Sequence, residues 1–289
     1  MKISEGLARG MTFSFEVFPP KNDQSLSPLL ETLDRLGRFG PDFISCTYGA
    51  GGTNQGRSLE ICAAIRERGI TPLAHLTAIG ASRSGLRSTV GAYAAAGVEN
   101  VLALRGDFPA GWTGTRGDFA HADAMTAFLR EEFPALCLAA AGYPEKHIAA
   151  SFFEEDLAYL RSKQDRGASF VMLQLCHDVE AYAAYRDRVR RAGVSIPLVA
   201  GLMPVLRRDA IIRMTLSNGC SIPAELAAIL GRYAQPEQEE DFSKAGMEYT
   251  VRQMHRFIAC GVEGLHLFTL NRWEAVSQIV EMSGLRIQV

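Results

Sequence analysis

The sequence lacks the features of several protein classes. Its formal net charge is −2 and its isoelectric point is about 6.3, so it has no basic excess that would attract nucleic acid, and none is expected as a partner. No apolar stretch approaches the roughly 18 residues of a membrane span, and the first residues, MKISEGLARGMTF, contain no signal-peptide core. We therefore expect a cytoplasmic protein without a membrane partner.

The absence of cysteine-pair and phosphate-binding motifs excludes further classes of protein. The six cysteines are scattered and none forms a C-x-x-C pair, so we expect reduced, mostly buried thiols and neither a disulfide framework nor a zinc knuckle. The G-x-G-x-x-G and G-x-x-x-x-G-K-[ST] fingerprints are absent. Metal-dependent hydrolase barrels usually carry an H-x-H pair at the end of the first strand, where this chain has Glu16 and Phe18. No metal is predicted.

Eight short apolar segments are present instead, with amphipathic helical segments between them. The segments span 12–18, 42–48, 71–77, 100–106, 136–143, 169–175, 196–205 and 264–270. Nearly continuous hydrophobicity indicates strands buried on both faces, and their alternation with helices indicates parallel β/α units. Eight such units in 289 residues predict a single (β/α)8 TIM barrel over 1–289. The long interval 206–263 predicts extra helices between strands seven and eight.

Each predicted strand ends in a polar or glycine-containing cluster. In chain order these are FEVFPP, CTYGAGG, AHLTA, LRGD, GYPEKH, LQLCHD, GLMP and FTLNR, and in a barrel the carboxyl ends of the strands form the active-site face. Glu16 lies inside an apolar strand, where an unpaired carboxylate would have a raised pKa and suit a general acid. A salt-bridged Glu16 is the alternative. His75, His147 and His177 follow strands singly, which fits ligand hydrogen bonding or a structural role better than metal binding.

Cationic and aromatic side chains also cluster at these ends. Arg105, His147 and Lys163 would supply cationic contacts to a diphosphate, and Tyr143 offers a stacking surface. Lys163 follows Asp156 by seven residues, so the two share one face of a predicted helix. The alternative for each is a solvated surface. The glycine-rich YGAGGTNQG segment fits either close approach of a ligand or a flexible loop.

With these clusters in this order, the sequence resembles the methylenetetrahydrofolate reductase family. The resemblance runs from FSFEVFPPK (13–21) to HLFTLNR (266–272) and includes TYGAGG, HLT, ALRGD, YPEKH, DLAYLRSK and GLMPV in the family's order. It implies a barrel that binds FAD and reduces 5,10-methylenetetrahydrofolate to 5-methyltetrahydrofolate with NADH or NADPH in a ping-pong reaction. It also implies a role in one-carbon metabolism and methionine biosynthesis, and a homo-oligomer.

The resemblance also implies roles for individual residues. Glu16 corresponds to the general acid that assists opening of the folate's five-membered ring, and Asp107 to a carboxylate beside flavin and pterin. Residues that match FAD-binding positions are Thr47, His75, Leu104, Arg105, Gly106, Asp107, Tyr143, His147, Asp156 and Lys163. Residues that match substrate-binding positions are Glu16, Gln174, Leu175 and Arg272. Within LRGD, Arg105 is expected to face the FAD diphosphate or ribityl chain.

Two departures from the family pattern concern the substrate side. After Gln174 the family usually has phenylalanines, where this chain has Leu175, Cys176 and His177, and Ala210 stands where a glutamine is expected. These changes indicate an atypical affinity for the substrate or an atypical choice of electron donor. Two alternatives stay open: another FAD barrel such as a proline dehydrogenase-like enzyme, and a flavin-binding subunit active only with a partner. A pterin-binding methyltransferase barrel, which would handle folate without flavin, is disfavoured by the residues that match FAD-binding positions.

Overall fold

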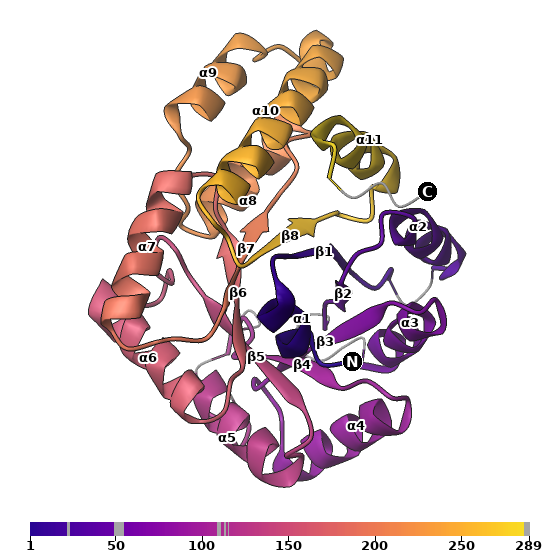
Figure 1. The fold of residues 1–289 in the computed structure, drawn as a ribbon, viewed down its shortest axis with the longest axis vertical. Helices are drawn as coiled ribbons and strands as arrows, with labels where there is room; N and C mark the ends of the chain where they lie inside the picture. The colour runs from indigo at the N-terminus through magenta and orange to yellow at the C-terminus, as the bar shows by residue number, and fades with distance from the viewer. Residues whose placement is uncertain (22–23, 49–54, 109–110, 113, 115, 286–289) are drawn as a thin grey trace.

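The structure is a computed structural model that describes residues 1–21, 24–48, 55–108, 111–112, 114 and 116–285. Eight parallel strands form a closed barrel in sequential order, and helices surround it (Figure 1). The strands are β1 (Thr12–Val17), β2 (Phe43–Cys46), β3 (Thr71–Thr77), β4 (Asn100–Leu104), β5 (Cys137–Gly142), β6 (Phe170–Leu175), β7 (Leu198–Leu202) and β8 (Gly264–Phe268). The predicted (β/α)8 TIM barrel is therefore confirmed.

One or more helices follow every strand. Those in the first seven units are α2 (Ser27–Gly37), α3 (Gln55–Glu67), α4 (Arg83–Ala95), α5 (Ala122–Glu132), α6 (Phe153–Asp165), α7 (Val179–Arg191) and α8 (Arg208–Ser217). Between α8 and β8 lie α9 (Ala224–Arg232), the 3-10 helix η2 (Pro236–Gln238) and α10 (Glu239–Ala259), and α11 (Trp273–Ser283) follows β8. The extra helices predicted between strands seven and eight are present.

A short helix before the barrel closes its amino-terminal end. In α1 (Ile3–Arg9) the side chains of Ile3 and Leu7 are buried in one apolar cluster with Phe43 and Phe170. The backbone N–H of Ile3 donates to Asn100 Oδ1 at 2.8 Å, and α1 lies near the centre of the ring in Figure 1. Since this end is plugged, a ligand has to enter from the opposite end.

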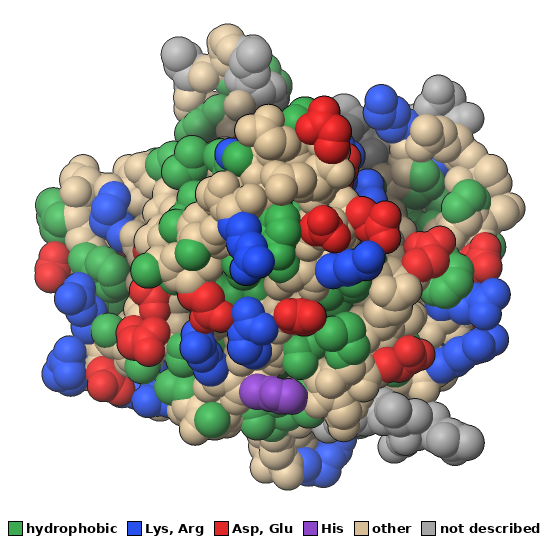
Figure 2. Space-filling view, turned by 90° about the horizontal axis from the view of Figure 1, so that it is seen from above, with side chains coloured by type: hydrophobic (Ala, Val, Ile, Leu, Met, Phe, Trp, Pro, Cys, Tyr) green, Lys and Arg blue, Asp and Glu red, His purple; other side chains and the backbone are tan. Residues whose placement is uncertain are grey.

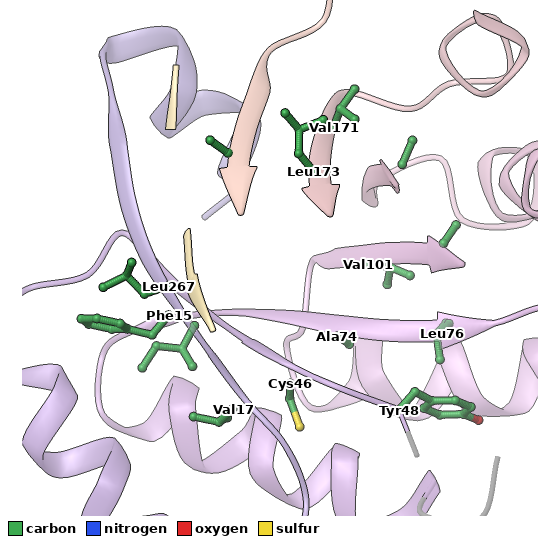
Figure 3. Packing of buried hydrophobic residues seen from close by; sticks show 14 of the residues in the cluster. Phe15, Val17, Cys46, Tyr48, Ala74, Leu76, Val101, Val171, Leu173 and Leu267 are labelled. Atoms are coloured by element: carbon green, nitrogen blue, oxygen red, sulfur yellow. The ribbon is translucent and has the colours of Figure 1, made fainter. Parts of the chain in front are cut away.

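Strand side chains alternate between the barrel interior and the helices. Phe15, Cys46 and Leu76 belong to the large buried cluster between strands and helices (Figure 3). Their neighbours Glu16, Ser45 and His75 take the other face, which is why polar residues within apolar strands gather inside the barrel. Figure 2 shows one outer face, on which acidic and basic side chains are interspersed. No helix in the described ranges is long and apolar enough to cross a membrane.

Candidate active site

A cavity of about 280 Å³ lies at the carboxyl ends of the strands. We call it the central cavity. Apolar side chains that include Met203, Met214, Leu175 and Phe268 form much of its wall. Its polar lining consists of Glu16, Thr47, His75, Tyr143, Gln174 and Asn218. A mostly apolar cavity with a few converging polar groups is the usual form of a small-molecule site.

Glu16 lies in this cavity beside two imidazoles. Its Oε2 is 3.8 Å from His75 Nε2 and 3.9 Å from His266 Nε2. Burial lowers the pKa of His75 to about 4, against the opposing effect of Glu16. His75 is therefore neutral near pH 7, and its contact with Glu16 is not an ion pair.

His266 is fixed by hydrogen bonds inside the barrel. Its Nδ1 lies 2.7 Å from Ser14 Oγ, its Nε2 lies 3.2 Å from Ser45 Oγ, and its ring stacks on Phe43. Strand register explains the arrangement, because Ser14 pairs with His266 and Glu16 pairs with Ser45. The sequence analysis did not identify Ser14, Ser45 or His266. The signal for Ser14 was the alternation of polar and apolar residues in β1, whereas Ser45 and His266 are single polar residues within β2 and β8.

A second cavity of about 140 Å³ shares Leu104, Ala141 and Tyr143 with the central cavity. We call it the cationic cavity, because its lining also includes Arg105, His147 and Lys163. Asp156 lies in the same lining, which confirms that Asp156 and Lys163 share a face of α6. The two cavities therefore adjoin each other at the strand ends.

Burial controls the charges in the cationic cavity. Lys163 is only 9% exposed, its Nζ donates to Ala141 O at 3.0 Å, and burial lowers its pKa while Asp156 raises it. Burial, followed by the charges of Arg105 and Lys163, lowers the pKa of His147. In the chain without a ligand a positive charge on His147 is therefore disfavoured, and its contact with a diphosphate stays a prediction.

Within the LRGD segment, Leu104 and Arg105 line the cavities and Asp107 lies on the surface. Gly106 has φ +85°, and a Cβ there would lie 2.6 Å from Ile79 Cγ2, so only glycine fits without a backbone shift. The Arg105 guanidinium lies 5.0 Å from the ring centroid of Phe108. Asp107 is exposed and lines neither cavity. Its predicted place beside flavin and pterin stays a prediction.

Other predicted site residues occupy different places. Thr47, Gln174 and Leu175 line the central cavity, whereas Arg272 lines a separate neighbouring cavity together with Ala210. Residues 49–54 of the YGAGGTNQG segment (48–56) lie outside the described residues. Among the described residues, no group of three or more His, Cys, Asp and Glu side chains is arranged to hold a metal ion.

Asn218 was also missed by the sequence analysis. Gln174 Nε2 donates to Asn218 Oδ1 at 3.0 Å, and Asn218 Nδ2 donates to Met214 O at 2.8 Å. Gln174 Oε1 accepts from the backbone N–H of Leu175 at 2.8 Å. The orientation of the Gln174 amide is therefore set by Asn218, at the end of α8. No sequence pattern marked this pair, because the two residues are 44 apart.

His177 follows a strand but does not reach the site. It is fully buried, neither ring nitrogen has a hydrogen-bond partner, and burial lowers its pKa to about 4. The next residue, Asp178, accepts hydrogen bonds from Glu180 N and Ala181 N as the N-cap of α7. His177 lines neither the central cavity nor the second cavity that adjoins it, so a direct ligand contact stays a prediction.

His177 gives a prediction about stability at acid pH. Its pKa is lower in the folded chain than the unfolded value of about 6.5, so the unfolded state binds more protons between pH 6.5 and pH 4. The free energy of unfolding must then fall as pH falls through this window, by about 2 kcal/mol at pH 5. We expect the His177→Phe variant to lack this decrease in the free energy of unfolding.

Urea denaturation at pH 8 and pH 5 measures the decrease, with His255→Phe as the control at an exposed histidine. An equal acid loss in His177→Phe and the unmodified chain would contradict the assignment.

Comparison with known proteins places these features in a family. The sequence model of methylenetetrahydrofolate reductase matches residues 2–284. Methylenetetrahydrofolate reductase 1 of Schizosaccharomyces pombe is 32% identical over 295 residues, covering 99% of this chain and 49% of that protein. The 5,10-methylenetetrahydrofolate reductase of Escherichia coli is 31% identical over 274 residues, covering 94% and 90%. The chain thus spans about half the length of the fungal relative and nearly all of the bacterial one.

Solved structures confirm the barrel. A Clostridium thermocellum protein described as binding two copies of 5-methyl-5,6,7,8-tetrahydrofolic acid has a TM-score of 0.65 and 11% identity, covering 98% of this chain and 99% of its own. At that identity the likeness shows the fold alone. The family match over nearly the whole sequence and the bacterial similarity carry the assignment. The chain belongs to the methylenetetrahydrofolate reductase family.

Proposed function

We propose that the chain reduces 5,10-methylenetetrahydrofolate to 5-methyltetrahydrofolate, with NADH or NADPH as the reductant and FAD as the bound cofactor in a ping-pong reaction. The observation that carries the proposal is a carboxyl group, Glu16, placed between two imidazoles at one end of an apolar cavity. A second cavity, with the cationic side chains of Arg105 and Lys163, adjoins it. Family membership supplies the reaction class.

The residues of the cationic cavity fit FAD. Arg105 and Lys163 would contact the diphosphate, and the buried Lys163 ammonium would lose its desolvation penalty only against an anion. Gly106 allows the backbone to approach a ligand, and His75 Nε2 is buried without a hydrogen-bond partner at the wall of the central cavity. Thr47, Leu104, Tyr143, His147 and Asp156 complete the proposed cofactor contacts. Bound FAD supplies hydride transfer between the two substrates.

Glu16 performs the proton chemistry in this proposal. Its protonated carboxyl delivers a proton to N10 of the folate as the bond from N10 to the methylene carbon breaks, which leaves a reactive iminium at N5. His75 is neutral near pH 7, so it does not trap Glu16 as a fixed ion pair. His266 and Ser45 lie on the barrel side of the carboxylate. The Glu16 side chain is 23% exposed, so solvent would return the proton to it after each turnover.

Gln174 is the proposed amide contact for both substrates, and Asn218 orients it. Loss of this hydrogen bond in Asn218→Ala is expected to raise KM for methylenetetrahydrofolate about three- to tenfold, because a hydrogen bond contributes about 0.5–1.5 kcal/mol. The value of kcat should change less, since the reacting groups stay in place. Asn218→Asp keeps the acceptor oxygen and should restore most of the affinity. Equal KM values for Asn218→Ala and Asn218→Asp would count against a positioning role.

The proposal has a direct spectroscopic test. Purified chain should show a yellow flavin spectrum, lose it with NADH under anaerobic conditions, and regain it with methylenetetrahydrofolate. A relative from Arabidopsis thaliana is named as NADH-dependent, so NADH is the first donor to try and NADPH the second. Failure to bind FAD would overturn the proposal. Reoxidation by a small amino-acid product in place of the folate would favour a proline dehydrogenase-like enzyme.

The proposal treats residues 1–289 as a single FAD-binding domain, because both cavities are built from strands and loops of one barrel. Cytoplasmic location and a homo-oligomer belong to the same proposal. Turnover by the isolated chain tests the alternative of a subunit that needs a partner protein. Activity that appears only after a second protein is added would support that alternative.

A further inference from the structure

Residues 218–221, which follow α8, are tied to the wall of the central cavity. We call them the α8–α9 segment. Asn218 Oδ1 accepts a hydrogen bond from Gln174 Nε2 at 3.0 Å, and the Cys220 thiol donates to the backbone oxygen of Leu175 at 3.0 Å. Gln174 and Leu175 both line the central cavity. A shift of the α8–α9 segment would therefore turn the Gln174 amide away from its present orientation.

One carboxylate holds this segment from the opposite side. The backbone N–H of Ser221 donates to Glu145 Oε2 at 2.8 Å, although the two residues are 76 apart in the sequence. Burial, followed by the charge of Glu145, raises the pKa of the Cys220 thiol to about 12, so the thiol keeps the proton of its hydrogen bond near neutral pH. Glu145 therefore acts on the α8–α9 segment through a direct hydrogen bond and through its charge.

Glu145 belongs to the loop between β5 and α6, which carries part of the proposed cofactor site. Tyr143 and His147 of this loop line the cationic cavity. The loop has hydrogen bonds of its own, because the His147 N–H donates to Asp156 Oδ2 at 3.1 Å and Lys146 Nζ donates to two backbone oxygens of the same loop. Loss of the Glu145 side chain would therefore release the α8–α9 segment and leave the β5–α6 loop in place.

The Glu145 carboxylate is only half satisfied in this position. Its Oε1 is buried and has no hydrogen-bond partner among the described residues. A buried acceptor without a partner lowers the stability of the fold. Stability alone therefore does not account for a carboxylate here, and its one hydrogen bond leads to the substrate side of the site.

We propose that Glu145 is a positioning residue that links the β5–α6 loop to the α8–α9 segment and thereby sets the orientation of the Gln174 amide toward the substrate. The inference rests on the proposed function and extends it to a residue that lines neither the central nor the cationic cavity. Glu145 acts through Ser221 and Asn218, without touching the ligand. Its loss should weaken the binding of a folate and leave the binding of FAD nearly unchanged.

Anaerobic calorimetric titration of the FAD-loaded chain with tetrahydrofolate tests this role without turnover, since this ligand lacks the one-carbon group that exchanges a hydride. Glu145→Ala is expected to raise its dissociation constant about three- to tenfold, as is Asn218→Ala, because each variant loses one hydrogen bond of the same connected set. The double variant should bind within about twofold of the weaker single variant, since contacts in one network are not additive. Glu145→Gln keeps an acceptor oxygen for the Ser221 N–H and should restore the affinity to within about twofold.

The matched control is Asp118→Ala. The Asp118 carboxylate also accepts a backbone N–H across two segments, from Arg83 at 2.7 Å, and neither residue lines the central or the cationic cavity. This variant should leave the dissociation constants of FAD and tetrahydrofolate unchanged. Fluorescence titration of the apoprotein gives the FAD value, which should stay within about twofold in Glu145→Ala.

The outcomes separate the inference from the function beneath it. Unchanged tetrahydrofolate binding in Glu145→Ala, or effects of Glu145→Ala and Asn218→Ala that multiply in the double variant, would overturn the positioning role. An equal loss of FAD and tetrahydrofolate affinity in Glu145→Ala would assign Glu145 to the folding of the barrel and overturn it as well. An unmodified chain that binds neither FAD nor tetrahydrofolate would overturn the proposed function itself.

Discussion

Glu16→Gln is expected to lower kcat for methylenetetrahydrofolate reduction by about 10²- to 10⁴-fold, the usual contribution of a positioned general acid. Glutamine has nearly the same shape, so the cavity and the contacts with His75 and His266 should persist, but it has no acidic proton to give to the folate. The bond from N10 to the methylene carbon would then have to break without protonation. Stopped-flow reoxidation of the reduced protein by methylenetetrahydrofolate measures the affected step.

The reductive half of the reaction provides the internal control. Oxidation of NADH with menadione as the acceptor requires no proton from Glu16 to a folate, so Glu16→Gln should retain it within a few-fold. Glu131→Gln, an exposed change on α5, should leave both reactions intact. A parallel loss of both activities in Glu16→Gln would indicate a binding or folding role for Glu16, and undiminished folate reduction would remove it from the proton chemistry.

The barrel was readable from the sequence because its strands carry a strong local signal. The run TPLAHLT was predicted as a strand at 71–77 and is β3 at Thr71–Thr77. Ends were less well predicted: the segment 196–205 contains β7 only at Leu198–Leu202, because Met203 and Pro204 turn into the loop that lines the cavities. The short α1 was not predicted, since its stability comes from Ile3 and Leu7 packing inside the barrel and not from its own sequence.

The candidate site was predictable to the extent that its residues follow strands directly. Glu16, Thr47 and Gln174 were placed at strand ends by sequence and all line the central cavity. Contacts that depend on the pairing of distant strands were not predictable. The position of His266 against Ser14 follows from β1 joining β8, and no local pattern encodes that closure. The pKa of His147 was not predictable either, because burial and the nearby charges of Arg105 and Lys163 lower it and both follow from the tertiary fold.

Lys163→Met is expected to weaken FAD binding by about 10²-fold or more, because removal of one partner from a buried, hydrogen-bonded charge pair typically costs 2–5 kcal/mol. Lys163 is the most buried cation of the cationic cavity, at 9% exposed. Methionine fills a similar volume but offers neither charge nor donor to a diphosphate. Titration of the apoprotein with FAD, followed by quenching of flavin fluorescence, gives the dissociation constant. Lys244→Met, at a surface ion pair on α10, is the matched control.

The stability of the apoprotein separates binding from folding in this experiment. Without a bound anion, Lys163→Met removes the desolvation penalty of the ammonium but also its hydrogen bond to Ala141 O and its charge opposite Asp156. The two effects oppose each other, so the change in melting temperature of the apoprotein should be small. A Lys163→Met protein that loses FAD yet melts at the same temperature or higher would show that this lysine is kept for the ligand. A lower melting temperature with an unchanged FAD dissociation constant would show the reverse, and would place the diphosphate away from α6.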